Sequence, residues 1–259
     1  MKPFNFIAYS RIKNDKGPVN TAEHYRYVGS LPFTSIKGDV RPTSDGGIIM
    51  CHDAGFTLDE NGRVTKFDKL NNTPILEMTT AQCLALEHAK QYDGHYCKVV
   101  DVETYIRICK ESGKAPFVTV RNEEIESVAP TILKLLEKYD LIESSVINSF
   151  TVSTLEIFRE LCPEIRLSRV IGLLRPADRS DVDIVIKLQN CILNCFHFTS
   201  SDSTSGLEAM DASADAIAYA AANGVDVYQA QVSDEVDINY LIERGISGAQ
   251  VLYAPTDMK

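Results

Sequence analysis

Residues 34–53, TSIKGDVRPTSDGGIIMCHD, contain two short runs that are typical of β-strands. The first run covers residues 34–40 and the second covers residues 47–51. Lys37 and Asp39 are two positions apart, so their side chains share one face of the first strand. His52 and Asp53 come directly after the second strand. The stretch therefore predicts two strands that carry ionisable side chains on or just beyond them.

The same kind of β-rich run recurs along the chain and alternates with amphipathic helical patterns. The candidate strands are residues 4–8, 34–40, 47–51, 116–120, 145–150, 165–172, 191–198, 225–232 and 248–253. The candidate helices are residues 21–30, 78–91, 101–113, 123–139, 151–161, 178–189, 211–223 and 234–244.

This alternation predicts the fold class. Eight βα units in series, with no internal repeat and no Pro/Gly/Ser-rich linker, favour one α/β domain over residues 1–259, a closed (β/α)₈ TIM barrel. A doubly wound open sheet is the alternative. Residues 54–100 break the pattern with turns at Asn61-Gly62, Asn71-Asn72 and Asp93-Gly94. We expect a small insertion there, after the second strand, on the rim where barrel active sites form.

Composition excludes several classes of function. The net charge of −10 argues against nucleic-acid binding, which needs a basic surface. No apolar run approaches the roughly 18 residues of a membrane span. The seven cysteines form no CxxC pair and suggest reduced, mostly buried thiols. We expect a soluble, cytoplasmic protein, because the apolar run at the start is too short for a signal peptide. A leader already removed would leave no trace in this sequence.

Residues 36–53 resemble the central signature of the glycerophosphodiester phosphodiesterase family. The matching positions follow one another without a gap: Asp39-Val40, Thr43, Asp45-Gly46, Ile48-Ile49-Met50 and His52-Asp53. A second specific match covers Asn148-Ser149-Phe150 with Leu155, Arg159 and Pro163. Less specific matches lie in Pro18-Val19-Asn20-Thr21 and in residues 241–255. The resemblance covers nearly the whole chain and implies a barrel that hydrolyses phosphodiester bonds of lipid-derived headgroups.

Several signature positions depart from the family pattern. The His-Arg-Gly at the end of the first strand corresponds to Ser10-Arg11-Ile12, or to Tyr9 if one gap is allowed. A metal-binding glutamate is replaced by Lys37, and the Glu-x-Lys of strand three becomes Thr119-Val120-Arg121. Gln229 stands where the family has a tryptophan. One imidazole and two carboxylates are thus missing.

The resemblance implies a reaction that this chain matches only in outline. In the family a divalent cation on three carboxylates polarises the phosphoryl group, and two histidines exchange protons with substrate. Asp39 is the one remaining carboxylate of that set, and it is a doubtful metal ligand beside Lys37. We therefore expect no cofactor beyond weak, inherited binding of Mg²⁺ or Ca²⁺. We also expect the metal-dependent reaction to be weak or absent.

The candidate site residues follow from the same comparison. The candidate catalytic residues are His52, Lys37 and Arg11, with the ammonium of Lys37 standing in for a cation. Arg121, Ser10 and His197 are candidate substrate-binding residues. The expected ligand is a phosphodiester or another small phosphorylated molecule. The alternative is a noncatalytic barrel that binds a phosphate-bearing small molecule or a protein partner, in which Lys37 only neutralises Asp39.

Overall fold

The computed structural model describes residues 3–9, 17–65, 73–121, 123–171, 175–195, 212–232 and 238–255. Eight parallel strands in these segments close into a barrel, because β1 pairs with both β2 and β13. In order around the barrel they are β1 (Asn5–Ala8), β2 (Ser35–Pro42), β8 (Ala115–Thr119), β9 (Val146–Ser149), β10 (Arg166–Ile171), β11 (Cys191–Cys195), β12 (Val227–Val232) and β13 (Ile246–Val251). The predicted (β/α)₈ barrel is confirmed.

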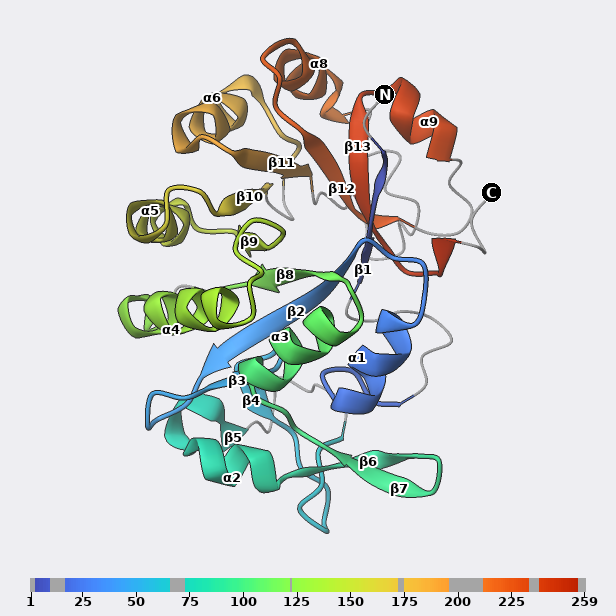
Figure 1. Ribbon diagram of the computed structural model, residues 1–259, viewed down its shortest axis with the longest axis vertical. Coiled ribbons are helices and arrows are strands. Elements are labelled where there is room, and N and C mark those ends of the chain that lie inside the picture. Colours follow the sequence, from blue (N-terminus) through green and yellow to red (C-terminus); the bar gives the residue numbers. More distant parts are fainter. Residues whose placement is uncertain are drawn as a thin grey trace.

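Helices surround the barrel (Figure 1). They are α1 (Ala22–Gly29), α3 (Val102–Glu111), α4 (Ile125–Lys138), α5 (Val152–Leu161), α6 (Arg179–Leu188), α8 (Ala214–Ala222) and α9 (Ile238–Glu243). Side-chain caps fix several of their starts: Thr21 accepts from His24 N–H, and Asp101 accepts from Thr104 N–H. Parts of some expected elements, residues 172, 196–198, 211 and 234–237, lie outside the described residues.

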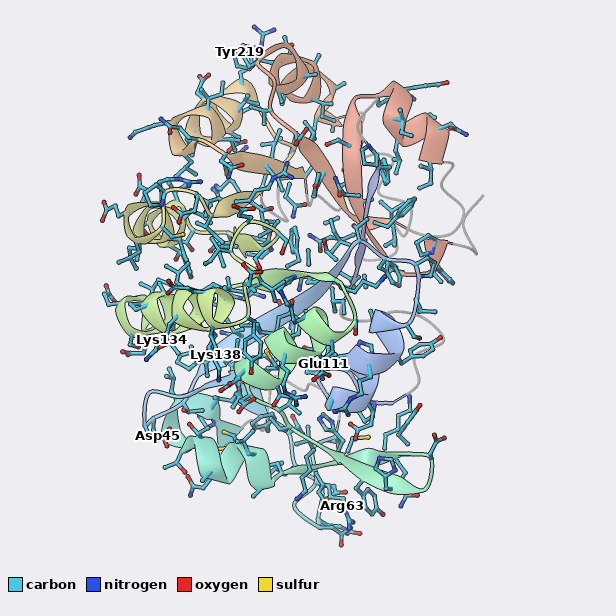
Figure 2. All side chains as sticks on the ribbon, in the orientation of Figure 1. Asp45, Arg63, Glu111, Lys134, Lys138 and Tyr219 are labelled. Atoms are coloured by element: carbon cyan, nitrogen blue, oxygen red, sulfur yellow. The ribbon has the colours of Figure 1, made fainter. Side chains whose placement is uncertain are left out.

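Each long helix buries one face and exposes the other. In α4 the buried side chains are Ile125, Val128, Ala129, Ile132 and Leu136. Lys134 and Lys138 of the same helix, like Glu111 of α3, project into solvent (Figure 2). This 3.6-residue periodicity is what stabilises a helix against the outside of a sheet. In the part of the chain that the structure describes, no helix combines the length and the apolar character needed to cross a membrane.

Strand β2 separates the apolar layer from the barrel interior. Ile36 and Val40 belong to the core between strands and helices. Lys37 and Asp39, which alternate with them, line a cavity at the mouth of the barrel. The strand is fully buried, so its register decides which of its side chains face that cavity.

Tyr105 of α3 holds β2 and β8 together. Its hydroxyl donates to Ile36 O at 2.6 Å and accepts from Phe117 N–H at 3.1 Å. The ring lies against Gly38, where an added Cβ would lie 2.5 Å from Cε at the flexible end of Met50 and 2.9 Å from Cζ of the rigid Tyr105 ring. Glycine at position 38 is therefore required by the close approach of a helix side chain.

The insertion forms its own small structure between β2 and α3. Strand β3 (Ile48–Met50) pairs antiparallel with β2, and β4 (Gly55–Phe56) pairs with β5 (Thr73–Pro74). A 3₁₀ turn (Ile75–Glu77), helix α2 (Thr80–Ala85) and a hairpin of β6 (Glu87–Tyr92) and β7 (His95–Lys98) follow. A separate apolar cluster lies beneath them: Ile49, Cys51, Phe56, Val64, Ile75, Cys83 and Val99.

The helix expected over residues 78–91 was wrong in its second half. A capping box between Thr79 and Gln82 starts α2, but the helix ends at Ala85. Asp93 and Gly94 both have positive φ, 48° and 81°. A two-residue turn of this kind matches the twist of a hairpin, so residues 87–92 pair with β7 instead of continuing the helix.

We predict that Gly38→Ala lowers the free energy of unfolding by about 1–3 kcal/mol, because the new methyl group overpacks the contact with the Tyr105 ring. Urea denaturation measures this directly. Tyr105→Phe, which removes the hydroxyl but keeps the ring, is the comparison: it should cost about 1–3 kcal/mol through the unpaired Phe117 N–H and Ile36 O. A Gly38→Ala variant as stable as the parent chain would contradict the close packing of β2 and α3.

Candidate active site

A small cavity of about 130 Å³ opens at the carboxyl ends of the barrel strands. This is the end at which βα barrels carry their active sites. Its lining comes from seven parts of the chain: Tyr9, Lys37, Asp39, His52, Thr119, Arg121, Asn148, Phe150, Val170 and Gln250. Ionisable groups of both signs therefore meet in one partly enclosed space.

Four of the predicted site residues come together here. Lys37 and Asp39 lie on β2, His52 follows β3 and Arg121 follows β8. Ser10, Arg11 and His197 lie outside the described residues. Their expected places at the barrel mouth remain predictions.

Lys37 and Asp39 form a buried ion pair at the centre of the cavity. Lys37 Nζ lies 2.5 Å from Asp39 Oδ2, and the two residues are 6% and 1% exposed. Arg121 Nη2 lies 3.9 Å from the other carboxylate oxygen. Burial opposes ionisation of Asp39, yet the neighbouring cations, Lys37 foremost, outweigh it and lower the pKa of this carboxyl. The carboxylate is thus ionised and faces two positive groups.

This donor set does not fit the divalent cation that the family resemblance implies. Ca²⁺ takes six to eight oxygen ligands, many of them from carboxylates and carbonyls, and Mg²⁺ is usually held by one or two carboxylates together with waters. Among the described residues that line the cavity, Asp39 is the one carboxylate, and its Oδ2 already accepts from Lys37. A cation at this carboxylate would also lie beside an ammonium and a guanidinium. The charge that a metal would supply is here supplied by side chains.

His52 is held in a defined orientation by its neighbours. Its Nδ1 lies 2.7 Å from Asp53 Oδ1, and a carboxylate only accepts, so Nδ1 carries the proton and donates it. Arg41 fixes the backbone here, donating to His52 O from Nη2 while its Nη1 donates to Glu123, each at 2.7 Å. This tautomer directs the lone pair to Nε2, the nitrogen suited to accept a proton from substrate.

The imidazole of His52 is neutral near pH 7. Burial is the strongest influence and lowers its pKa from the ordinary value, against the opposite effects of Asp39 and Asp53. The Asp53 carboxylate orients this imidazole through its bond to Nδ1.

A buried polar network forms the floor of the cavity, and the sequence did not single it out. Asn148 Nδ2 donates to Thr119 Oγ1 at 3.0 Å, and Asn148 Oδ1 accepts from Ser168 and Asn194 at 2.8 and 3.1 Å. Gln250 of β13, 2% exposed, also lines the cavity. The Asn148-Ser149-Phe150 match was the one available signal, because an isolated polar residue in a strand does not reveal which way it faces.

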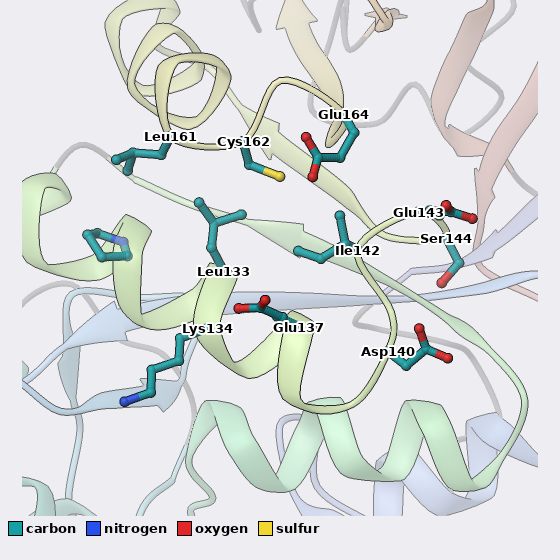
Figure 3. A pocket seen from close by; sticks show the side chains of 11 residues that line it. Leu133, Lys134, Glu137, Asp140, Ile142, Glu143, Ser144, Leu161, Cys162 and Glu164 are labelled. Atoms are coloured by element: carbon teal, nitrogen blue, oxygen red, sulfur yellow. The ribbon is translucent and has the colours of Figure 1, made fainter.

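Larger hollows lie at the opposite end of the barrel. One of about 740 Å³ is formed by α4, α5 and the loops that lead into β9 and β10, and it is lined by Glu137, Asp140, Glu143 and Glu164 among others (Figure 3). It contains no histidine, and it lies at the amino ends of the strands. The smaller cavity with His52 is therefore the better candidate for chemistry.

Comparison with known proteins gives one consistent result. Residues 13–251 match the glycerophosphoryl diester phosphodiesterase family. A structure from Silicibacter pomeroyi DSS-3, described as a protein of that type, aligns with a TM-score of 0.77 and 16% identity over 98% of this chain and 92% of its own. A phosphodiesterase from Oleispira antarctica, in complex with the product sn-glycerol-3-phosphate, aligns with a TM-score of 0.75 and 15% identity over 98% and 94%.

A third structure, a glycerophosphodiester phosphodiesterase from Parabacteroides distasonis, aligns with a TM-score of 0.68 and 14% identity over 96% of this chain and 94% of its own. Identities this low establish a shared fold. No curated protein matches the sequence significantly.

We predict that Lys37→Met lowers the free energy of unfolding by about 3–5 kcal/mol, because it leaves the buried Asp39 carboxylate without its closest partner. The double variant Lys37→Met/Asp39→Leu should recover most of this loss, because it removes both charges together. A double-mutant cycle measured by urea denaturation at pH 7 gives the coupling energy. If the effects of the two single substitutions on the free energy of unfolding were additive, the coupling energy would be zero. The ion pair between Lys37 and Asp39 would then not contribute to stability in solution.

Proposed function

The chain belongs to the glycerophosphoryl diester phosphodiesterase family, and from this premise we propose that its barrel mouth binds a glycerophosphodiester and hydrolyses it slowly without a divalent cation. The observation that carries the proposal is the ammonium of Lys37, 2.5 Å from the one carboxylate in the described lining of a cavity that also contains His52. Positive charge and a proton acceptor are thus both present without a metal.

The charges of the cavity suit a singly charged phosphodiester. Lys37 and Arg121 together carry two positive charges, and Asp39 carries one negative charge, so the three leave a net charge of +1 in a site of reduced dielectric. Arg121 is the more accessible cation, with 25% of its side chain exposed. Its planar fork can bind two phosphate oxygens, while Lys37 acts as a point charge deeper in the site. The product in the Oleispira antarctica complex, sn-glycerol-3-phosphate, is a phosphate monoester that shares the glycerol phosphate group of a glycerophosphodiester.

His52 would act as the general base. Its Nε2 accepts a proton from the attacking water, the water oxygen forms a new bond to phosphorus, and the bond from phosphorus to the leaving alkoxide breaks. Asp53 stabilises the imidazolium that results, because Nδ1–H already donates to it. Lys37 and Arg121 stabilise the charge on the phosphoryl oxygens in the transition state, the role that preorganised cations perform in other sites.

The leaving alkoxide also needs a proton. Among the described residues that line the cavity, His52 is the one imidazole. No second histidine among them is therefore available to protonate the leaving alkoxide. A general acid contributes roughly 10²–10⁴ to the rate. The same observation favours the second candidate function, a noncatalytic barrel that retains phosphate binding through Lys37 and Arg121.

We predict slow hydrolysis of glycerophosphocholine, about 10²–10⁴-fold below that of a complete family site, with no change on adding EDTA. A nitrophenyl phosphodiester should react faster, because nitrophenolate leaves without being protonated. His52→Ala should remove activity on both substrates. Initial rates are measured with each substrate, with EDTA and with added Mg²⁺, for the parent chain and for His52→Ala.

The two candidate functions give different outcomes in this assay. If the parent chain and His52→Ala both gave background rates on both substrates, the hydrolytic function would be excluded. Saturable thermal protection by glycerol phosphate, lost in Lys37→Glu, would then favour the binding protein. Strong activation by Mg²⁺ would contradict both the proposal and the poor fit of the cavity to a metal.

The pH dependence of kcat/KM tests the role of His52 separately. Burial lowers the pKa of this imidazole below the 6.5 of an ordinary histidine, so a base that must be neutral becomes active at lower pH. We predict that activity on the nitrophenyl substrate falls as pH decreases, with a midpoint below 6.5, and is level around pH 7–8. Asp53→Asn should move the midpoint to lower pH, because the Asp53 carboxylate raises this pKa. A midpoint above 6.5 would argue against His52 as the base.

A further inference from the structure

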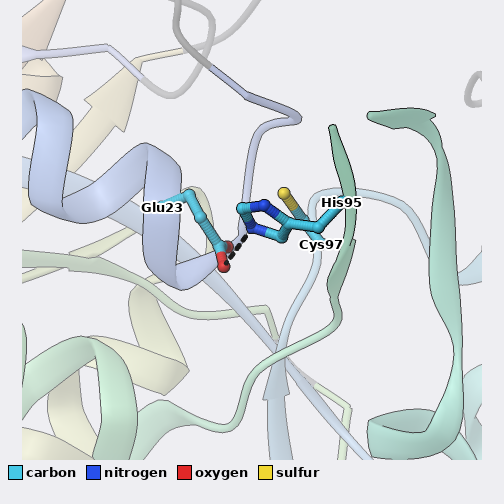
Figure 4. A group of neighbouring side chains, drawn as sticks. All are labelled: Glu23, His95 and Cys97. Atoms are coloured by element: carbon cyan, nitrogen blue, oxygen red, sulfur yellow. Dashed lines mark ion pairs between the residues drawn. The ribbon is translucent and has the colours of Figure 1, made fainter. Parts of the chain in front are cut away.

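A second group of chemically reactive side chains lies between helix α1 and the insertion hairpin. Glu23 is in the first turn of α1, and His95 and Cys97 are on β7 (Figure 4). None of the three lines the cavity that contains His52. The group belongs to a different part of the surface and has no role in the proposed reaction.

The ligand-type atoms of these side chains converge. One carboxylate oxygen, one imidazole nitrogen and the sulfur lie within 4.8 Å of one another. Glu23 Oε1 is 3.5 Å from His95 Nε2, and Cys97 is 1% exposed. Cys97 hydrogen-bonds to the Glu23 carboxylate, while Glu23 Oε2 is buried without a hydrogen-bond partner among the described residues. A carboxylate oxygen that is buried without a hydrogen-bond partner lowers the stability of the fold, and a bound cation would supply the missing partner.

We propose that Glu23, His95 and Cys97 bind a Zn²⁺ ion or a similar borderline transition-metal ion. Sulfur, imidazole nitrogen and carboxylate oxygen are together the donor types that zinc accepts, whereas Mg²⁺ and Ca²⁺ require oxygen ligands. Around a tetrahedral zinc, neighbouring donors are roughly 3.5 Å apart. Glu23 Oε1 and His95 Nε2 already have this separation, and no pair in the group must approach by more than about 1.3 Å, the difference between 4.8 Å and 3.5 Å.

The surroundings suit such a site. His95 has 54% of its side chain exposed, which gives an ion an entry path from solvent. Thr21 caps α1 and fixes its first turn, while the hairpin turn at Asp93-Gly94 fixes β7. Three protein ligands leave the fourth position of the metal for water. Binding converts the Cys97 thiol to a thiolate, releases its proton to solvent and joins the insertion hairpin to the first helix of the barrel.

The test is titration of the full metal-free chain with Zn²⁺ and with Co²⁺. Calorimetry should show one Zn²⁺ per chain and a raised melting temperature, with no effect from Mg²⁺ or Ca²⁺. Co²⁺ should give a thiolate-to-cobalt charge-transfer band and the intense visible bands of tetrahedral cobalt. A cobalt spectrum without the thiolate band, or no binding, would overturn the proposal.

Variants locate the site. His95→Ala, which alters a half-exposed residue and so leaves folding intact, should weaken Zn²⁺ binding at least about 100-fold, since even outer-shell partners of a metal contribute 10–100-fold. Cys97→Ser should also remove the charge-transfer band. Cys83→Ser, another buried cysteine of the insertion, is the matched control and should keep the band, and His52→Ala should bind Zn²⁺ as the parent chain does. Binding that survives His95→Ala and Cys97→Ser, or is lost in His52→Ala, would place the metal elsewhere.

Discussion

The ion pair between Lys37 and Asp39 is the constraint on which the barrel mouth depends. Two charges that are almost completely buried are tolerable only when each neutralises the other, because desolvation of either one alone costs several kcal/mol. The alternation of β2 brings them to one face, and the contact of Tyr105 with Gly38 holds that strand in place from the other face. The Lys37 and Asp39 charges therefore neutralise each other before any ligand arrives, and Arg121 adds one further positive charge beside them.

The barrel could be predicted from the sequence, because closed barrels leave a regular alternation of buried strands and one-sided helices. The same reasoning failed at residues 87–91, where a run without strong periodicity follows a short capped helix. There the turn at Asp93-Gly94 and the pairing with β7 decided the structure, and pairing partners are not visible in a local pattern. Tertiary contacts overrode local preference in the part of the chain that departs from the regular βα repeat.

The site residues likewise fall into those that the sequence revealed and those that it did not. Lys37, Asp39, His52 and Arg121 could be identified because they occupy or replace positions of the family signature, and all four line the same cavity. The polar floor under them could not, since Asn148, Ser168 and Asn194 contact one another only after β9, β10 and β11 pair in register. The group at Glu23, His95 and Cys97 is still less visible in sequence, because more than 70 residues separate the helix from the hairpin.

Strand β3 joins two separate cores, and this affects His52. Ile48 and Met50 pack in the main core, whereas Ile49 and Cys51 pack in the core of the insertion. His52 and Asp53 follow immediately, so their position depends on the insertion as much as on the barrel. Small clusters of apolar residues open more readily than large ones, as amide hydrogen exchange reveals in many proteins. A sub-global opening confined to the insertion would move the imidazole away while the cations stayed in place. In the reaction proposed above, the general base and the phosphate-binding cations would thus belong to units of different local stability.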